Sequence, residues 1–90
     1  MIKVENMVSS KGNTVANQFI ITTDDAIFFQ SYGSLIAMKK DGKITLFEDW
    51  NYSKTTSKYR AAFLRETTAE TQKKLDNGEY TLTNSNTITL

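Results

Sequence analysis

The pair Asp41-Gly42 narrows the range of possible folds for this 90-residue chain more than any other feature. It separates two strand-like segments, residues 35–39 and 44–47, and both of its residues tolerate positive φ angles. A two-residue type I′ turn requires that tolerance at both positions, so the pattern predicts a β-hairpin. An antiparallel sheet is therefore expected, and the segments before the hairpin extend it.

Three more strand-like segments precede this hairpin. Residues 2–8 begin with Ile2 and Val4, residues 14–22 are rich in β-branched side chains, and residues 26–32 form an apolar run. The segment 23–25 predicts a turn. A second turn is expected at Gly33-Ser34, because glycine adopts positive φ at no steric cost.

The apolar spacing changes after residue 50. Tyr59, Ala62 and Phe63 recur at helical spacing and predict an amphipathic helix of about three turns. Several hydroxyl side chains among residues 53–56 are candidates for its N-cap. The chain therefore moves from a region of strands to a region of helices near its middle.

A second helix is expected to follow at once. The motif Thr67-x-x-Glu70 is a capping box that opens it, and Asn77-Gly78 ends it. Residues 80–83 predict a further strand, and residues 84–90 either a terminal strand or a frayed tail. The expected fold is a single α+β domain over residues 1–90. It has a largely antiparallel sheet of about four to six strands, with two short helices packed on one face.

Histidine and cysteine are absent from the chain. The first absence removes the commonest general base and metal ligand, and the second excludes thiolate catalysis and zinc–thiolate sites. The four glycines stand apart at positions 12, 33, 42 and 78, so no phosphate-cradling loop is present. We therefore expect a protein that is not an enzyme and that uses no cofactor.

Two pairs of adjacent carboxylates lie at predicted strand ends, Asp24-Asp25 and Glu48-Asp49. If the two turns met in space, their oxygens could hold Mg²⁺ or Ca²⁺. Adjacent acids are also common at turns for backbone reasons alone, and this second interpretation is favoured. We therefore expect no metal site.

The ends and the apolar runs of the sequence bear on location. Residues 1–6 lack a signal-peptide pattern, and no apolar run approaches the roughly 18 residues that a membrane span requires. We expect a cytoplasmic protein with no membrane partner.

Four cations and no acid lie between Lys54 and Arg65, although the net charge of the whole chain is only +1. This basic stretch covers the expected start of the first helix, where free N–H groups and a partial positive charge favour phosphate or carboxylate groups. The candidate partner-binding residues are Tyr32, Tyr52, Lys54, Thr55, Lys58 and Arg60.

Each candidate also has a purely structural interpretation. Lysines and arginines on a helix are most often a solvated face, and Tyr32 is expected to cover the core with its hydroxyl bonded locally. We expect Trp50 and Phe63 to point inward and Tyr52, Lys54, Lys58 and Arg60 to point outward.

Several of these residues resemble a family pattern. The run from Gln30 to Ala37, then residues 50–59 and Phe63-Leu64, is similar to a "SYxTxIA … WxYSxTTxKHxxxFL" pattern in small phage and prophage proteins of unknown function. The resemblance covers roughly residues 14–64. The chain departs from the pattern at Tyr59, where many relatives carry histidine, and at Ser34, where they carry threonine. The resemblance implies a phage or mobile-element origin and brings no known activity.

These observations lead to one expected function and one alternative. The first is a phage-borne accessory protein that binds a host or phage protein, or a protein–nucleic acid complex. Its most concrete form is an inhibitor of a bacterial defence complex such as a CRISPR effector. The alternative is a nucleic-acid-binding accessory of phage replication that uses Trp50, Tyr52, Lys54, Lys58 and Arg60. In either case we expect a monomer or homodimer in the cytoplasm of the bacterial host.

Overall fold

The computed structural model describes residues 1–85, and its elements follow the predicted order of strands, two helices and a final strand. The expectation for residues 84–90 lies largely outside this part of the chain, and Asn84 and Ser85 belong to no strand. The elements are β1 (Lys3–Val8), β2 (Thr14–Thr22), β3 (Ala26–Ser31), β4 (Ser34–Lys40), β5 (Lys43–Phe47), α1 (Lys54–Leu64), α2 (Thr68–Asp76) and β6 (Thr81–Thr83).

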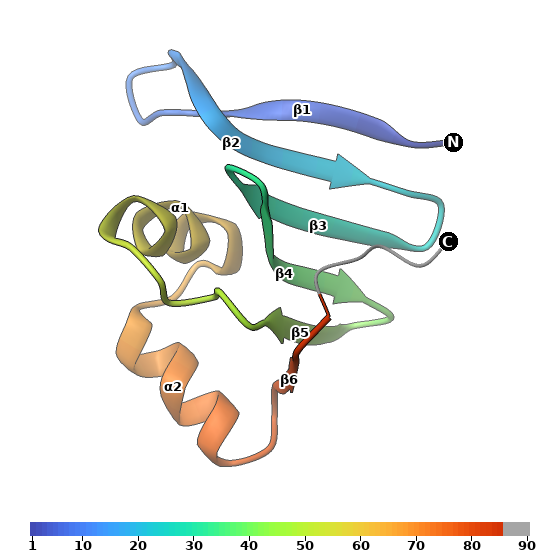
Figure 1. Ribbon diagram of the computed structural model, residues 1–90, viewed down its shortest axis with the longest axis vertical. Coiled ribbons are helices and arrows are strands. Elements are labelled where there is room, and N and C mark those ends of the chain that lie inside the picture. The colour runs from blue at the N-terminus through green and yellow to red at the C-terminus, as the bar shows by residue number, and fades with distance from the viewer. Residues whose placement is uncertain (86–90) are drawn as a thin grey trace.

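The six strands form one sheet in sequence order, from β1 at one edge to β6 at the other (Figure 1). All neighbours from β1 to β5 are antiparallel, whereas β6 runs parallel to β5. A parallel neighbour needs a crossover connection, and the two helices between β5 and β6 provide it. The predicted α+β fold with a largely antiparallel sheet is confirmed.

The Asp41-Gly42 turn forms as predicted, with φ angles of 53° and 74° between the paired residues Lys40 and Lys43. The turn expected at Gly33-Ser34 was placed one residue too late. Ser31 pairs with Ser34, so the two loop residues are Tyr32 and Gly33. A register shift between Phe29 and Gln30 accompanies this pairing, and Tyr32 takes the positive φ of 53°.

Both helices begin at the predicted hydroxyl caps. The Ser53 hydroxyl accepts the N–H of Thr56 at 3.1 Å to start α1. In α2, Thr67 and Glu70 form the predicted capping box. The last turn of α1 is stabilised by Lys39, whose Nζ donates to the Phe63 carbonyl at 2.6 Å, as a cation near a helix C-terminus should.

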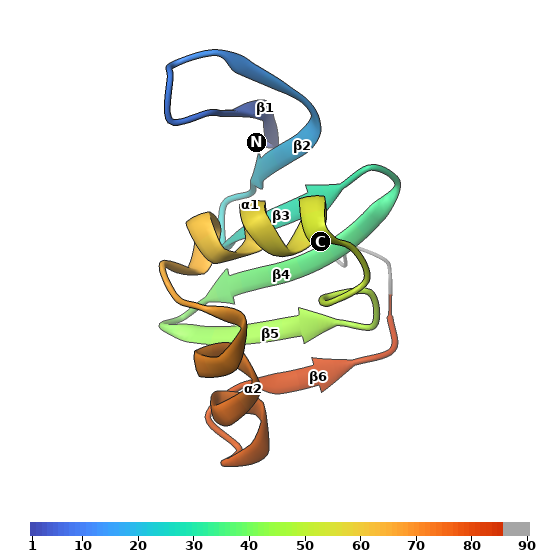
Figure 2. The same ribbon diagram turned by 90° about the vertical axis from the view of Figure 1, so that its left-hand side faces the viewer.

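The main core lies between the sheet and the helices. Figure 2 shows α1 in front of β3 and β4, with α2 beside the β5–β6 end of the sheet. The ring centroids of Phe29 and Phe63 are 5.8 Å apart across this contact. The expectation that Trp50 and Phe63 point inward is confirmed, because both are buried. The buried members of this core are Phe29, Ile36, Ala37, Leu46, Trp50 and Phe63.

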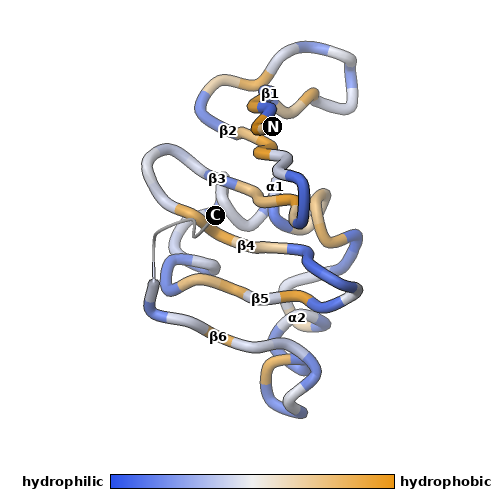
Figure 3. Tube along the Cα trace, turned by 90° about the vertical axis from the view of Figure 1, so that its right-hand side faces the viewer, coloured by the Kyte–Doolittle hydropathy of each residue, from blue (hydrophilic) through white to orange (hydrophobic). Residues whose placement is uncertain are grey.

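A second apolar cluster comes from the other face of the same strands, since successive side chains of a strand point to opposite faces. The rings of Phe28 and Phe47 lie 6.4 Å apart within it. Figure 3 shows the molecule from the side opposite to Figure 2, with apolar stretches along β3, β4 and β5. The buried members of this cluster are Ile21, Ala26, Phe28, Leu35 and Phe47.

The helices are short. α1 has 11 residues and α2 has 9, and neither of these described helices is long and apolar enough to cross a membrane.

Candidate functional site

The start of α1 and the β3–β4 turn lie together at one end of the sheet. Ser31 and Thr56 share a hydrogen bond of 2.8 Å between their hydroxyls, and both side chains are buried. The Ser34 hydroxyl donates to the Asp49 carboxylate at 2.9 Å. These two bonds tie both sides of the turn to the chain around α1. As a result, Tyr32 sits at the same end of the molecule as the first turn of α1.

Most of the candidate binding residues are exposed at this end. Tyr32 is 48% exposed and Tyr52 is 59% exposed, and Lys54, Thr55 and Lys58 are exposed as well. The structure therefore brings five of the six candidates to accessible positions. Whether a partner binds them remains a prediction.

An open hollow of about 490 Å³ lies beside the first turns of α1, and we call it the basic hollow. Two lysines and several hydroxyl groups line it, and no carboxylate does. Thr55 and Tyr32 lie outside this lining. The lining residues are Asn51, Tyr52, Ser53, Lys54, Ser57, Lys58, Ala61 and Thr68.

Arg60 does not belong to the exposed face, and the expectation that it points outward was wrong. Its side chain is 0% exposed. Thr56, Arg60 and Phe63 recur at intervals of four and three residues, so they share the side of α1 that faces the sheet. The solvated-face interpretation, which rests on average behaviour of arginine, also fails at this position.

The Arg60 guanidinium is held by neutral acceptors. Nη1 donates to the Trp50 carbonyl at 2.6 Å and makes a longer bond of 3.4 Å to the Ser57 hydroxyl. Nη2 donates to the Thr68 hydroxyl at 2.6 Å. Its centre lies 4.9 Å from the Trp50 ring, within the range of a cation–π contact. Ser57 and Thr68 also line the basic hollow, so the buried charge lies directly behind its wall.

Burial lowers the pKa of Arg60, and the Glu66 carboxylate opposes that shift. A guanidinium nevertheless stays protonated in proteins. The hollow thus combines two exposed ammonium groups on its lining with a permanent positive charge behind it. Such an arrangement attracts a carboxylate or phosphate group and repels cations.

Glu66 is the centre of a second polar cluster, and this cluster is structural. Its carboxylate accepts hydrogen bonds from Lys74 at 2.7 Å, from Thr71 at 2.8 Å and from Tyr80 at 3.0 Å. Burial alone would raise the pKa of Glu66, but these hydrogen bonds outweigh it and hold the pKa below its ordinary value. The hydrogen bond to Glu66 raises the pKa of Lys74. The cluster joins the end of α1 to α2 and to the chain entering β6.

Gln18 is a buried polar residue that sequence reasoning missed. Its side chain is 0% exposed, and neither amide atom has a hydrogen-bond partner within the described chain. A glutamine between Asn17 and Phe19 in a strand carries no signal of burial, because glutamine is usually exposed. Gln18 pairs with Ser31 in the sheet and therefore shares its face, below α1.

The two carboxylate pairs do not meet. Asp24-Asp25 connects β2 to β3 at the end of the sheet where Ala26, Lys40 and Lys43 lie, whereas Glu48-Asp49 follows Phe47 at the opposite end. Across residues 1–85, no group of three or more acidic side chains is close enough to hold a metal ion.

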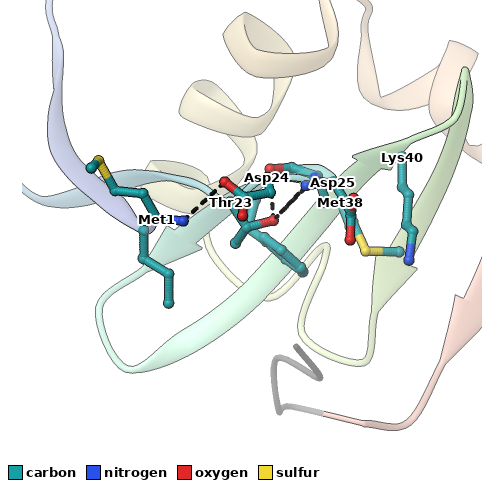
Figure 4. A pocket seen from close by; sticks show the side chains of 9 residues that line it. Met1, Thr23, Asp24, Asp25, Met38 and Lys40 are labelled. Atoms are coloured by element: carbon teal, nitrogen blue, oxygen red, sulfur yellow. Dashed lines mark hydrogen bonds and ion pairs between the residues drawn. The ribbon is translucent and has the colours of Figure 1, made fainter.

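The Asp24-Asp25 turn instead borders a pocket of about 190 Å³ (Figure 4). Within the turn, the Thr23 hydroxyl accepts the N–H groups of Asp25 and Ala26, at 3.3 and 3.0 Å. The Asp24 carboxylate lies 2.9 Å from the amino group of Met1. These contacts are those of a capped turn, which agrees with the backbone interpretation of the acidic pair.

Fold and surface together define a small α+β domain whose helical side carries a basic, hydroxyl-lined hollow. The chain belongs to a family of unknown function, DUF8033, whose model matches residues 2–79. No curated protein and no solved structure matches the chain. The sequence resemblance implied a family of unknown function, and the match to this family agrees with it.

Proposed function

We propose that this protein is a non-catalytic binding protein that recognises an anionic group on a macromolecular partner through the basic hollow. The observation that carries the proposal is the placing of three cations around one open surface. Lys54 and Lys58 line the hollow, Arg60 lies behind it, and no carboxylate is part of the lining.

The shape of the hollow supports a macromolecular partner over a small ligand. Small-molecule sites are usually concave and enclose most of the ligand surface. The basic hollow is open and is flanked by the exposed ring of Tyr52, a residue type that is enriched in protein interfaces. The hydroxyls of Ser53, Ser57 and Thr68 add hydrogen-bonding groups next to the lysines.

The partner we propose is a protein or a protein–nucleic acid complex of the bacterial host. The resemblance to small phage and prophage proteins favours a defence complex, such as a CRISPR effector, which an accessory protein of a phage would inhibit. An effector complex that carries bound nucleic acid presents phosphate groups, and phosphate groups attract lysine side chains.

The test compares two double variants with the unaltered protein. Lys54→Glu/Lys58→Glu reverses the charge of the hollow, and Lys40→Glu/Lys43→Glu makes the same change at exposed positions at the opposite end of the sheet. Capture of a purified effector and protection of phage in an effector-bearing host are measured for all three. The first variant should lose both activities and the second should keep them. Absence of capture and protection by the unaltered protein would reject the defence partner.

Nucleic acid is the second candidate, and the exposed ring of Tyr52 beside Lys54 and Lys58 favours it. Fluorescence titration with single- and double-stranded DNA at several salt concentrations tests it. In a plot of the logarithm of the binding constant against the logarithm of the salt concentration, each phosphate contact contributes a slope of about −0.7 to −0.9. Lys54→Glu/Lys58→Glu should therefore make the slope less steep by the contribution of about two contacts. Binding that is absent at low salt, or that does not respond to salt, would reject this candidate.

A further inference from the structure

β1 is an open edge of the sheet, and none of its residues lines the basic hollow. Its one strand neighbour among the described residues is β2, and Figure 1 shows it at the end of the molecule away from α2 and β6. All its side chains are exposed except Met7, which is half-buried. An edge strand of this kind presents unpaired N–H and C=O groups to which another strand can add.

The hydrogen bonds of β2 show which backbone groups of β1 point outward. Thr23 N–H donates to the Ala26 carbonyl, and Tyr32 N–H donates to the Asn17 carbonyl, so the odd-numbered residues of β2 bond to β3. By alternation, its even-numbered residues bond to β1. Their partners are Lys3 and Glu5, because Lys3 pairs with Thr22 and Glu5 with Ile20. The N–H and C=O groups of Val4 and its even-numbered neighbours Ile2 and Asn6 therefore face away from the sheet.

The side chains of β1 are divided by charge between its two faces. Lys3 and Glu5 share one face, and their charged groups lie 3.4 Å apart. Val4 occupies the other face together with its partner Ile21 of the second apolar cluster. Val4 is 60% exposed and Ile2 is 51% exposed, so this edge extends the apolar face of the sheet into solvent.

We propose that β1 pairs antiparallel with β1 of a second copy of this chain, around a two-fold axis at Val4. In this register each Val4 lies opposite the other and each Ile2 lies opposite Asn6, through backbone groups that already point outward. Lys3 of each copy lies opposite Glu5 of the other, at the non-hydrogen-bonded positions where side chains approach most closely. The two sheets would join into one continuous sheet.

Charge selects this register over its neighbours. An axis at Lys3 would place two lysines face to face, and an axis at Glu5 would place two glutamates face to face. Like charges directly opposite one another destabilise a strand pair, whereas opposite charges stabilise it. An axis at Asn6 would run into the irregularity that interrupts β1 between Asn6 and Val8. The same chemistry favours a second copy over an unrelated strand, because the sequence around Val4 is complementary to itself.

Light scattering and sedimentation at increasing concentration test the proposal with three charge variants. Lys3→Glu and Glu5→Lys each place two like-charged pairs across the axis, and each should weaken the dimer at least about tenfold. The exchange variant Lys3→Glu/Glu5→Lys restores two opposite pairs and should recover most of the affinity. Circular dichroism verifies that each variant is folded. A protein that stays monomeric at the highest concentrations, or an exchange variant no better than the single variants, would overturn the proposal.

Amide exchange followed by NMR identifies the strand involved. On raising the concentration, the amides of Ile2, Val4 and Asn6 should become protected, while those of Lys3 and Glu5 should be protected at every concentration. Protection that increases along β6 instead would place the contact at the other edge and overturn the proposal. The inference is independent of the proposed function, because neither the lysines of the basic hollow nor Arg60 takes part in it.

Discussion

The Arg60 guanidinium donates a 2.6 Å hydrogen bond to the backbone carbonyl of Trp50 and lies 4.9 Å from the ring of the same residue. One residue of the first helix is thereby bonded to the segment that leads from the sheet into that helix. A third contact, from Nη2 to the Thr68 hydroxyl, reaches the first residue of α2. Arg60 therefore holds together the three segments that form the basic hollow.

Loss of Arg60 should destabilise the fold. Arg60→Ala removes a fully buried side chain and leaves the buried carbonyl of Trp50 without its donor, so we expect a loss of about 3 kcal/mol in the free energy of unfolding. Urea denaturation measures it. Lys58→Ala, on the exposed side of the same helix, is the control and should change stability by less than about 0.5 kcal/mol. Equal effects of the two changes would contradict the burial of Arg60.

The Ser31–Thr56 hydrogen bond should contribute a measurable coupling energy. Thr56→Val keeps the shape of the side chain but leaves the buried Ser31 hydroxyl unpaired, at an expected cost of about 1–2 kcal/mol. Ser31→Ala should cost a similar amount, and the double variant should cost about 1 kcal/mol less than the sum. Thr55→Val, at an exposed neighbouring position, serves as the control. Strict additivity would mean that the two hydroxyls do not interact.

Replacing Gln18 with methionine should stabilise the protein. A buried amide without partners costs about 1–3 kcal/mol, and methionine fills nearly the same volume with apolar atoms, so we expect a gain of about 1 kcal/mol. Thermal unfolding followed by circular dichroism measures it. Gln30→Met is the matched control and should destabilise, because the Gln30 amide donates to the Tyr32 carbonyl at 2.7 Å. A destabilising effect of Gln18→Met would show that the Gln18 amide has partners in solution.

Stability should fall at acid pH through Glu66. Its pKa in the folded state lies below the ordinary value of 4.5, so just below that pH the unfolded chain binds more protons than the folded chain. The contribution of Glu66 is complete above the ordinary pKa and is lost as the pH falls through the folded-state pKa. Urea denaturation from pH 3 to pH 7 measures the change.

Glu66→Gln should flatten that pH dependence in part. Part of the pH dependence of stability remains in this variant, because the pKa of Glu70 is also lowered, chiefly by the backbone hydrogen bond from Thr67 in the capping box. Glu79→Gln, which removes an exposed carboxylate nearby in the chain, is the control for the loss of one acidic group. A Glu66→Gln protein with the original profile would assign the acid sensitivity to other groups.

The features predicted correctly from sequence depend on neighbouring residues. The turn at Asp41-Gly42 needs two residues that tolerate positive φ, and the capping box needs Thr67 three residues before Glu70. Both requirements can be read within four consecutive positions. The helical spacing that placed Phe63 inside is a similar short-range signal, whereas Trp50 was placed inside because large aromatic side chains are usually buried.

The features that the sequence did not reveal depend on residues far apart in the chain. Arg60 is buried because Trp50 and Thr68 supply acceptors that only the packing of α1 against the sheet brings together. The β3–β4 turn takes Tyr32 and Gly33 because Ser31 and Ser34 are held by pairing and by bonds to Thr56 and Asp49.

The amino-acid sequence by itself thus determined the order of the elements, their caps and most of the exposed basic residues, because periodicity and turn chemistry act over a few positions. The tertiary structure decided which cation is buried, which hydroxyls face the hollow and that β6 runs parallel to β5. Each of these outcomes depends on contacts between distant segments, and a single sequence contains no signal for such contacts beyond average residue preferences.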